Sequence, residues 1–343
     1  MINKLLFSAF FLSTFFLKAQ NLEIDTLLTD KISIRAIQLW DGKVWYSGTD
    51  AKFGFIDWRQ PKNQKQIKVS EKSLQFRTLG QNDRDFFLVS IESPGYLFKI
   101  NKKSLKVEKV FQDDSKSAFY DALLFVNNKV AYAFSDSNNG KMKLLTTKDG
   151  GDTWFFSKVF DKITLREGEA AFAASNTNIA AKGSRVWIAT GGKSSRIFRM
   201  ETSTSDKIIA EVFNTPFVQG SSSQGMYSID FANETFGIAV GGDYTLQSEN
   251  KNNIATTEDG GATWQIQASG ANAGYMTCVR IKPGSQGKEI IAVGDQHISY
   301  SQDYGKTWKV ISHEKNLYVA EWVDASTLIF AGKDRIIKVK IKS

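Results

Sequence analysis

Seven copies of one two-strand unit predict an all-β chain folded as a seven-bladed β-propeller. Each copy is a strand of alternating side chains, a turn, and an apolar strand that ends in small or turn residues. The second strands end at residues 48, 90, 135, 191, 241, 294 and 332, so successive ends are 38 to 56 residues apart. A repeat of this length built from strands is typical of propeller blades.

The expected strands can be assigned in order along the chain. First strands are predicted at residues 33–39, 75–79, 119–125, 171–175, 226–231, 275–279 and 318–322. A third and a fourth strand follow each pair, as at residues 141–147 and 154–159. The last copy has a third predicted strand, at residues 334–341, but no fourth. Residues 22–28 are therefore expected to complete the last blade and close the ring, which removes an open sheet edge.

Three turns between third and fourth strands share the pattern Ser/Thr-x-Asp-x-Gly-x-Thr-Trp. The hydroxyl and the carboxylate can hydrogen-bond the turn backbone, glycine adopts conformations that a Cβ penalises, and tryptophan returns the chain to the core. We expect these carboxylates to be used inside their own turns rather than in chemistry. The residues given this structural role are Asp149, Gly151, Trp154, Asp259, Gly261, Trp264, Asp303, Gly305 and Trp308.

The start of the chain predicts export. Lys4 precedes an apolar run at residues 5–17, and Ala19 precedes a plausible cleavage point, so residues 1–19 are expected to be a signal peptide. Residues 20–343 are then expected to form one propeller domain located in the periplasm or outside the cell. No later segment is long and apolar enough to predict a transmembrane helix.

Composition narrows the classes of partner. The chain has 343 residues and a formal charge of +8, but its lysines are scattered along the strands, which argues against a nucleic-acid surface. Cys278 is the only cysteine, so no internal disulfide can form and stability must come from the core. We expect a monomer.

The sequence resembles a known family in several of these segments. Residues 33–37, 119–122, 134–136, 168–175, 190–192 and 240–244 resemble propellers related to plant photosystem II stability/assembly factors, and the three turns resemble the Asp boxes of bacterial neuraminidase repeats. The resemblance implies a seven-bladed propeller. It also implies a non-catalytic role, because the photosynthetic relatives are assembly factors.

The inward-facing positions of the first strands bring two arginines and an aspartate together. Because side chains alternate along a strand, one repeat position faces the channel in every blade. That position is Arg35, Arg77 and Asp121 in the first three copies. Either Asp121 neutralises the arginines permanently, or the arginines form an anion site that binds a ligand carboxylate in a bidentate fork.

The loops after the second strands are expected to meet at one rim, close to these arginines. The longest excursions of the chain, such as residues 161–169 and 242–253, should all emerge there, and insertions on one face commonly mark a binding face. Aspartates that only stabilise turns are the alternative explanation. The candidate binding residues are Arg35, Arg77, Tyr120, Asp121, Asp136, Glu169, Asp243, Tyr244, Tyr275 and Asp295.

Two functions follow as hypotheses. The first is a non-catalytic binding or assembly protein that holds an anionic or peptide partner, and the second is a sialidase-like glycoside hydrolase acting on an acidic glycan. No Gly-x-Gly-x-x-Gly turn supports a nicotinamide or flavin enzyme, and no cofactor is expected. His297 and His313 are the only histidines, which is too few for a histidine metal site, so no metal is expected.

Overall fold

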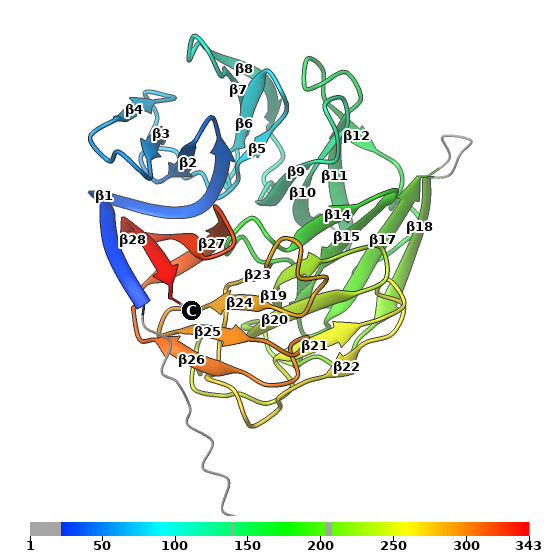
Figure 1. Ribbon diagram of the computed structural model, residues 1–343. Coiled ribbons are helices and arrows are strands. Elements are labelled where there is room, and N and C mark those ends of the chain that lie inside the picture. Colours follow the sequence, from blue (N-terminus) through cyan, green and yellow to red (C-terminus); the bar gives the residue numbers. More distant parts are fainter. Residues whose placement is uncertain (1–21, 139, 203–207, 343) are drawn as a thin grey trace, which may run out of the picture.

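Every regular element in the described part of the chain is a β-strand. The computed structural model describes residues 22–138, 140–202 and 208–342, and the predicted signal peptide lies outside these residues. Neighbouring strands pair antiparallel, and Figure 1 shows the sheets arranged around a ring in sequence order, from blue to red. The predicted all-β class is confirmed. Among the residues described, there is no helix with the length and apolar character needed to cross a bilayer.

The two ends of the described chain share one sheet. In spatial order this six-stranded sheet consists of β27 (Leu317–Trp322), β28 (Thr327–Ile341), β1 (Leu22–Trp40), β2 (Lys43–Gly48), β3 (Lys52–Asp57) and β4 (Gln64–Lys68). β1 runs antiparallel to β28 from the pair Leu22/Ile341 onward, and its later residues pair with β2. The predicted pairing of residues 22–28 with the last strand is therefore present.

The prediction of seven blades is wrong, because the strands hydrogen-bond into six sheets and the propeller has six blades. The reason is the length of β1 and β28, which are 19 and 15 residues long. β1 continues without a break from its pairing with β28 into its pairing with β2. The units that the sequence predicts as the first and last blades are thus joined into one sheet.

The other sheets are built from strands that follow one another in sequence. Three sheets of four strands are β5 (Gly80–Gln81), β6 (Asp85–Val89), β7 (Gly95–Asn101) and β8 (Val107–Asp113); β9 (Tyr120–Phe125), β10 (Ala131–Asn138), β11 (Lys141–Thr147) and β12 (Phe155–Ser157); and β14 (Ile179–Lys182), β15 (Arg185–Ala189), β17 (Arg196–Thr202) and β18 (Ile208–Asn214). A fourth is β23 (Cys278–Ile281), β24 (Ile290–Val293), β25 (Ile298–Ser301) and β26 (Lys309–Ser312). The second six-stranded sheet adds β13 (Glu169–Ala170) and β16 (Gly191–Gly192) to β19 (Gln224–Phe231), β20 (Gly237–Asp243), β21 (Ile254–Thr257) and β22 (Gln265–Ile266).

One predicted inner strand is absent. Residues 171–175 do not form a strand; the inner strand of that sheet is β14, and residues 171–178 instead cross the channel. Ser175 Oγ donates to the carbonyl oxygen of Thr277 at 2.6 Å, and Asn176 Nδ2 donates to the carbonyl oxygens of Leu79 and Leu123 at 3.1 and 3.2 Å. We call residues 171–178 the plug. The positive φ of Asn176, 59°, ends any extended run at this point.

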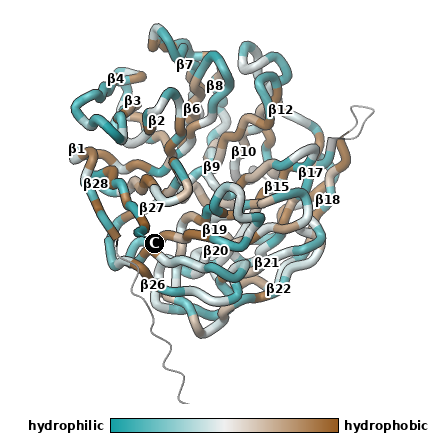
Figure 2. Tube along the Cα trace, in the orientation of Figure 1, coloured by the Kyte–Doolittle hydropathy of each residue, from teal (hydrophilic) through white to brown (hydrophobic). Residues whose placement is uncertain are grey.

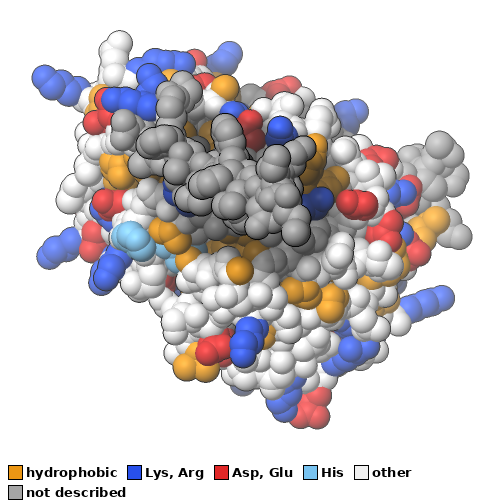
Figure 3. Space-filling model, turned by 60° about the horizontal axis from the view of Figure 1, so that its bottom comes forward, with side chains coloured by type: hydrophobic (Ala, Val, Ile, Leu, Met, Phe, Trp, Pro, Cys, Tyr) orange, Lys and Arg blue, Asp and Glu red, His pale blue; other side chains and the backbone are white. Residues whose placement is uncertain are grey.

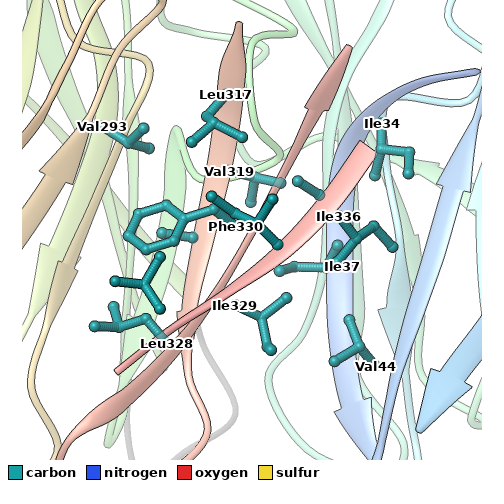
Figure 4. Packing of buried hydrophobic residues seen from close by; sticks show 14 of the residues in the cluster. Ile34, Ile37, Val44, Val293, Leu317, Val319, Leu328, Ile329, Phe330 and Ile336 are labelled. Atoms are coloured by element: carbon teal, nitrogen blue, oxygen red, sulfur yellow. The ribbon is translucent and has the colours of Figure 1, made fainter. Parts of the chain in front are cut away.

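The sheets are held together by side chains that alternate into the spaces between them. Figure 2 shows hydrophobic stretches along the strands and hydrophilic ones in the outer loops. In the joined sheet, Ile34, Val44, Leu328, Phe330 and Ile336 are fully buried, and Figure 4 shows them packed between the strands of the sheet and its neighbour. Several such buried clusters take the place of the disulfides that the chain lacks, since Cys278 is buried as a free thiol.

The three Asp-box turns connect third and fourth strands, namely β11–β12, β21–β22 and β25–β26. In the second of them, Asp259 Oδ1 accepts hydrogen bonds from Thr257 Oγ1 at 2.8 Å and from the Thr263 amide at 2.9 Å, while Asp259 Oδ2 accepts one from Thr263 Oγ1 at 2.6 Å. The carboxylates of Asp149 and Asp303 accept the equivalent bonds. Each carboxylate is therefore engaged within its own turn.

The Asp-box glycines also lie against the preceding sheet. A Cβ on Gly151 would lie 2.2 Å from Cε1 of Phe87 in β6, and one on Gly261 would lie 3.1 Å from Trp187 in β15. Trp187 Nε1 additionally donates to the Gly260 carbonyl oxygen at 2.8 Å. Each of these turns thus packs one blade on the previous one, at the ends of the strands opposite the loops that follow the second strands.

Candidate functional site

A pocket of about 350 Å³ lies where the loops after the second strands meet the channel. We call it the rim pocket. Five of its lining residues are binding candidates predicted from the sequence, namely Arg35, Arg77, Tyr244, Tyr275 and Asp295. The other lining residues are Phe172, Ala173, Ala174, Tyr227 and Gln247.

The plug holds the two arginines of this pocket. Arg35 Nη1, from β1, donates to the carbonyl oxygen of Ala174 at 2.9 Å, and Arg77 Nη1, from just before β5, donates to that of Ala173 at 3.4 Å. The guanidinium carbon of Arg35 also lies 4.0 Å from the centre of the Tyr318 ring. Within the described part of the chain, the other nitrogens of both guanidinium groups have no hydrogen-bond partner, so they remain able to bind an anion.

The positive charges in the pocket are only partly compensated. Burial lowers the pKa of Arg77, and repulsion from Arg35 lowers it further, while Glu92 and Asp121 act in the opposite direction. Asp121 is fully buried in β9. It therefore contributes a neutralising field, but the hydrogen bonds of the two arginines go to plug carbonyls rather than to a carboxylate.

Aromatic rings form the opposite wall. The rings of Phe172 and Tyr227 stack with centroids 4.0 Å apart, and Tyr275 meets Tyr227 edge to face at 4.9 Å. Tyr227 Oη donates to the Ser223 carbonyl oxygen at 2.7 Å, which fixes the stack to the loop before β19. Tyr244 is half exposed at the pocket's edge. Tyr227 and Tyr275 are buried, so the apolar surface that this wall offers beside the arginines comes chiefly from Phe172 and Tyr244.

Asp295 is the carboxylate that lines the pocket. It follows β24, and its Oδ2 accepts a hydrogen bond from Gln247 Nε2 at 2.9 Å. Burial raises the pKa of Asp295, and Gln247 and Arg35 offset part of that rise. The pocket therefore presents hydrogen-bond donors on one side and an acceptor on another.

Besides Asp121, four other predicted binding residues lie outside the lining of the pocket and have other partners or positions. Tyr120 Oη donates to Asp113 Oδ2 at 3.2 Å, and burial raises the pKa of Tyr120. Asp243 Oδ1 accepts hydrogen bonds from the Thr245 amide and hydroxyl at 2.9 and 2.6 Å, which is the turn-stabilising role considered as the alternative. Asp136 is in β10, but its side chain lies outside the described residues.

Glu169, the fourth, is buried in an ion pair. Its Oε2 lies 2.6 Å from Arg196 Nη2, and its Oε1 accepts a hydrogen bond from Thr190 Oγ1 at 2.6 Å. These contacts attach β13 to β17 beside the plug. A sialidase-like hydrolase would need a Tyr–Glu nucleophile pair, for which Tyr275 and Glu169 are the candidates in this sequence. Tyr275 lines the pocket, whereas Glu169 lies outside its lining and is paired with Arg196.

Sequence reasoning missed the aromatic stack and the plug carbonyls. The inner strand predicted at residues 171–175 contains Phe172 and the two alanines that follow it, and these residues belong to the plug instead. The lack of β-branched residues in residues 170–174 is the available signal against a strand. Nothing in the sequence indicates that the plug, which does not follow the strand pattern, should cross the channel.

The opposite mouth of the channel has a second pocket, of about 340 Å³, whose charges compensate one another. Successive inner strands end there in Lys182, Asp230, Arg280 and Glu321, with alternating sign. Arg280 Nε lies 3.0 Å from Glu321 Oε2, and Asp230 Oδ2 accepts the Ile281 amide at 2.8 Å. The rim pocket differs, because its two neighbouring cations face neutral carbonyls.

No other charged cluster in the described residues suggests a metal site, since no group of three or more His, Cys, Asp or Glu side chains could hold an ion. On the face shown in Figure 3, Lys and Arg side chains are interspersed with Asp and Glu rather than gathered in one patch. The rim pocket is thus the place where two arginines without a direct carboxylate partner coincide with aromatic side chains.

Comparison with known proteins finds similarity in structure alone. No protein-family model matches the sequence, and no curated protein matches it. Similar solved structures are YCF48 bound to D1 peptide, with a TM-score of 0.66 and 13% identity over 95% of this chain and 97% of that one, and YCF48 from Cyanidioschyzon merolae, with 0.64 and 10% over 92% and 98%. A streptogramin B lyase structure is also similar, with 0.67 and 15% over 95% of this chain and 100% of that one. The expected resemblance to photosystem II assembly-factor propellers is therefore confirmed at the level of the fold, which the chain shares with both a peptide-bound propeller and a lyase.

Proposed function

We propose that this chain is a non-catalytic binding protein that holds a carboxylate-bearing segment of a protein or peptide in the rim pocket. The observation that carries the proposal is the pairing of Arg35 and Arg77, which each give one nitrogen to a plug carbonyl and keep the others available. Two guanidinium groups arranged in this way suit a carboxylate, which accepts their planar donors in a fork.

The contrast between the two channel mouths supports this choice of site. Arg280 at the far mouth is already paired with Glu321, so an incoming anion there would meet a filled partner and a second carboxylate, Asp230. At the rim pocket the nearest partners of the arginines are carbonyl oxygens, which carry no net charge. A ligand carboxylate would therefore gain more at the rim pocket.

The shape of the pocket favours a peptide over a small inorganic ion. Its volume of about 350 Å³ exceeds what an inorganic ion fills, and the stacked rings of Phe172 and Tyr227 offer surface for an apolar side chain. One structurally similar propeller is itself a complex with a peptide, which supports the same class of ligand for this fold. Export through residues 1–19 is part of the proposal, and it puts the partner outside the cytoplasm.

An array of blocked decapeptides tests the proposal. Each acidic peptide is paired with a twin in which Glu and Asp are replaced by Gln and Asn. We expect the protein to capture acidic members preferentially, and the R77Q variant to lose about tenfold or more in affinity for them, as expected for a charge-assisted contact. Equal capture of both twins, or capture indifferent to R77Q in a normally folded protein, would refute the proposal.

The hydrolase alternative has its own control. Wild type and R35A are incubated with a sialoside and with other acidic glycosides, and released sugar is measured. Because Glu169 is committed to Arg196, we expect no turnover. Turnover that R35A abolishes would replace the binding proposal with an enzymatic one.

A further inference from the structure

The rim pocket contains an acceptor as well as donors. Asp295 shares the pocket with Arg35 and Arg77, yet the hydrogen bonds of these arginines go to the plug. A carboxylate in a pocket meant only for anions would repel every ligand, since like charges in a partly buried site are unfavourable. Its presence therefore places a second requirement on the ligand.

The position of Asp295 is fixed by its neighbours. Its backbone carbonyl accepts the Asn316 amide at 2.8 Å, and its Oδ2 accepts Gln247 Nε2 at 2.9 Å. Gln247 is held in turn by Gln296, whose Nε2 donates to Gln247 Oε1 at 3.2 Å. Among the described residues, Asp295 Oδ1 has no hydrogen-bond partner, so it remains as an acceptor within the pocket.

We propose that Asp295 is a specificity-determining residue, which selects ligands that carry an N–H donor next to their carboxylate. The inference rests on the function proposed above and narrows its ligand class. A peptide carboxylate has a backbone N–H within a few bonds, so it can bind the arginines and Asp295 together. Phosphate dianions, sulfate and simple carboxylic acids lack that donor and meet the negative charge of Asp295 without compensation.

The aromatic wall favours a ligand that also carries an aromatic ring. Phe172, Tyr227 and Tyr275 form a continuous edge-to-face and stacked group beside the two charged sides. A ligand with a ring, a carboxylate and an N–H donor on one carbon would contact all three sides. N-acetyl-L-phenylalanine is a small probe with these groups.

Titration calorimetry with three matched probes tests the proposal. N-acetyl-L-phenylalanine has the donor, N-acetyl-N-methyl-L-phenylalanine has the same skeleton without it, and 3-phenylpropionate has hydrogen in place of the amide. In wild type we expect the first probe to bind about tenfold more tightly than the other two, as expected for a hydrogen bond to a charged group.

Two substitutions of Asp295 separate its charge from its acceptor oxygen. D295N keeps an acceptor, so it should retain part of the preference, whereas D295L should abolish the preference. Both should strengthen the binding of 3-phenylpropionate, because the repelling charge is gone. If D295L does not fold, the affinity of D295N for 3-phenylpropionate still tests whether the negative charge of Asp295 weakens the binding of ligands that lack the donor.

The R77Q variant distinguishes the two ways in which the idea can fail. If the three probes bind wild type equally and R77Q weakens all of them, the carboxylate pocket stands and the role of Asp295 is wrong. If D295N leaves the affinity for 3-phenylpropionate unchanged, the selection by charge is also wrong. If no probe binds at millimolar concentration, the proposed function and this inference both fail for carboxylates of this size.

Discussion

Arg35 donates a hydrogen bond to the carbonyl oxygen of Ala174, 139 residues further along the chain, at 2.9 Å. This bond ties the plug to β1 and leaves the guanidinium with nitrogens that face the rim pocket. One side chain thus connects the closure of the channel to the candidate binding site.

The two arginines should differ in their effect on stability. R35Q removes the shorter bond and the contact with Tyr318, so we expect it to lower the free energy of unfolding by about 1–2 kcal/mol. R77Q removes a longer bond of 3.4 Å and a buried charge that Arg35 repels, so its effect should be near zero or stabilising. Urea denaturation of both variants measures this, and a larger loss in R77Q than in R35Q would contradict it.

The strand that closes the ring should contribute strongly to stability. A chain that begins at Asp30 lacks all the pairs between β1 and β28 except Ser33 with Lys333, and it also lacks the buried side chains of Leu27 and Leu28. Relative to a chain that begins at Leu22, we expect its melting temperature to fall by roughly 10 °C or more, since several kcal/mol are lost. Equal melting temperatures in thermal denaturation would show that the closing strand is dispensable.

The Asp-box carboxylate should matter for stability and not for binding. D259A removes the acceptor of the hydrogen bonds that Thr257 and Thr263 donate within the turn, so we expect a loss of about 1–2 kcal/mol in the free energy of unfolding and no change in peptide capture. The exposed neighbour Glu258 supplies the matched control, because E258A removes a carboxylate from the same turn without touching these bonds. A loss of capture in D259A at unchanged stability would assign the Asp box to the binding site.

The buried pair beside the plug should be costly to break. E169A leaves the guanidinium of Arg196 buried without its carboxylate, and such a change is expected to cost about 3–5 kcal/mol. E167A removes the adjacent carboxylate from an exposed pair with Lys193, so it should change the free energy of unfolding by less than about 0.5 kcal/mol. Chemical denaturation compares them, and similar small losses would show that the Glu169–Arg196 pair is not a structural anchor.

His297 predicts a pH dependence of stability. It is buried, and burial together with the charge of His313 lowers its pKa from 6.5 to about 4. The unfolded chain therefore binds a proton near pH 6.5 that the folded chain refuses until about pH 4, so stability should fall as the pH drops through this window and be unaffected above it. H297Q should flatten that part of the profile, while H313Q should leave most of the slope. An unchanged slope in H297Q would refute the assignment.

Much of this architecture could be predicted from the sequence, because strand periodicity and turn chemistry are local. The alternating strands and the Asp-box turns depend on residues that are close together in the sequence. The pairing of the N-terminal strand with β28 could be predicted because the last copy of the repeat has one strand fewer than the others. The predicted number of blades was wrong because nothing local indicates that β1 continues from its pairing with β28 into its pairing with β2 within one sheet.

The candidate site was predictable only in part, for the same reason. Arg35, Arg77 and Asp295 follow from repeat positions and loop ends, so a periodic argument finds them. The plug does not obey the repeat, and its contacts, such as Asn176 with Leu79 and Leu123, are set by the whole ring. Glu169 ends one of the loops predicted at the rim, but its side chain is paired with Arg196 of β17, a contact that strand periodicity does not predict.

The antiparallel pairing of Leu22 with Ile341 has a mechanical consequence. If the molecule is pulled apart through these two residues, the force acts on the hydrogen bonds between β1 and β28 one after another, starting from the free ends. Such a joint opens like a zipper at low force, whereas strands loaded along their length would have to break many bonds together. Tension applied at Leu22 and Ile341 is therefore expected to open the ring at a lower force than tension applied along the two strands.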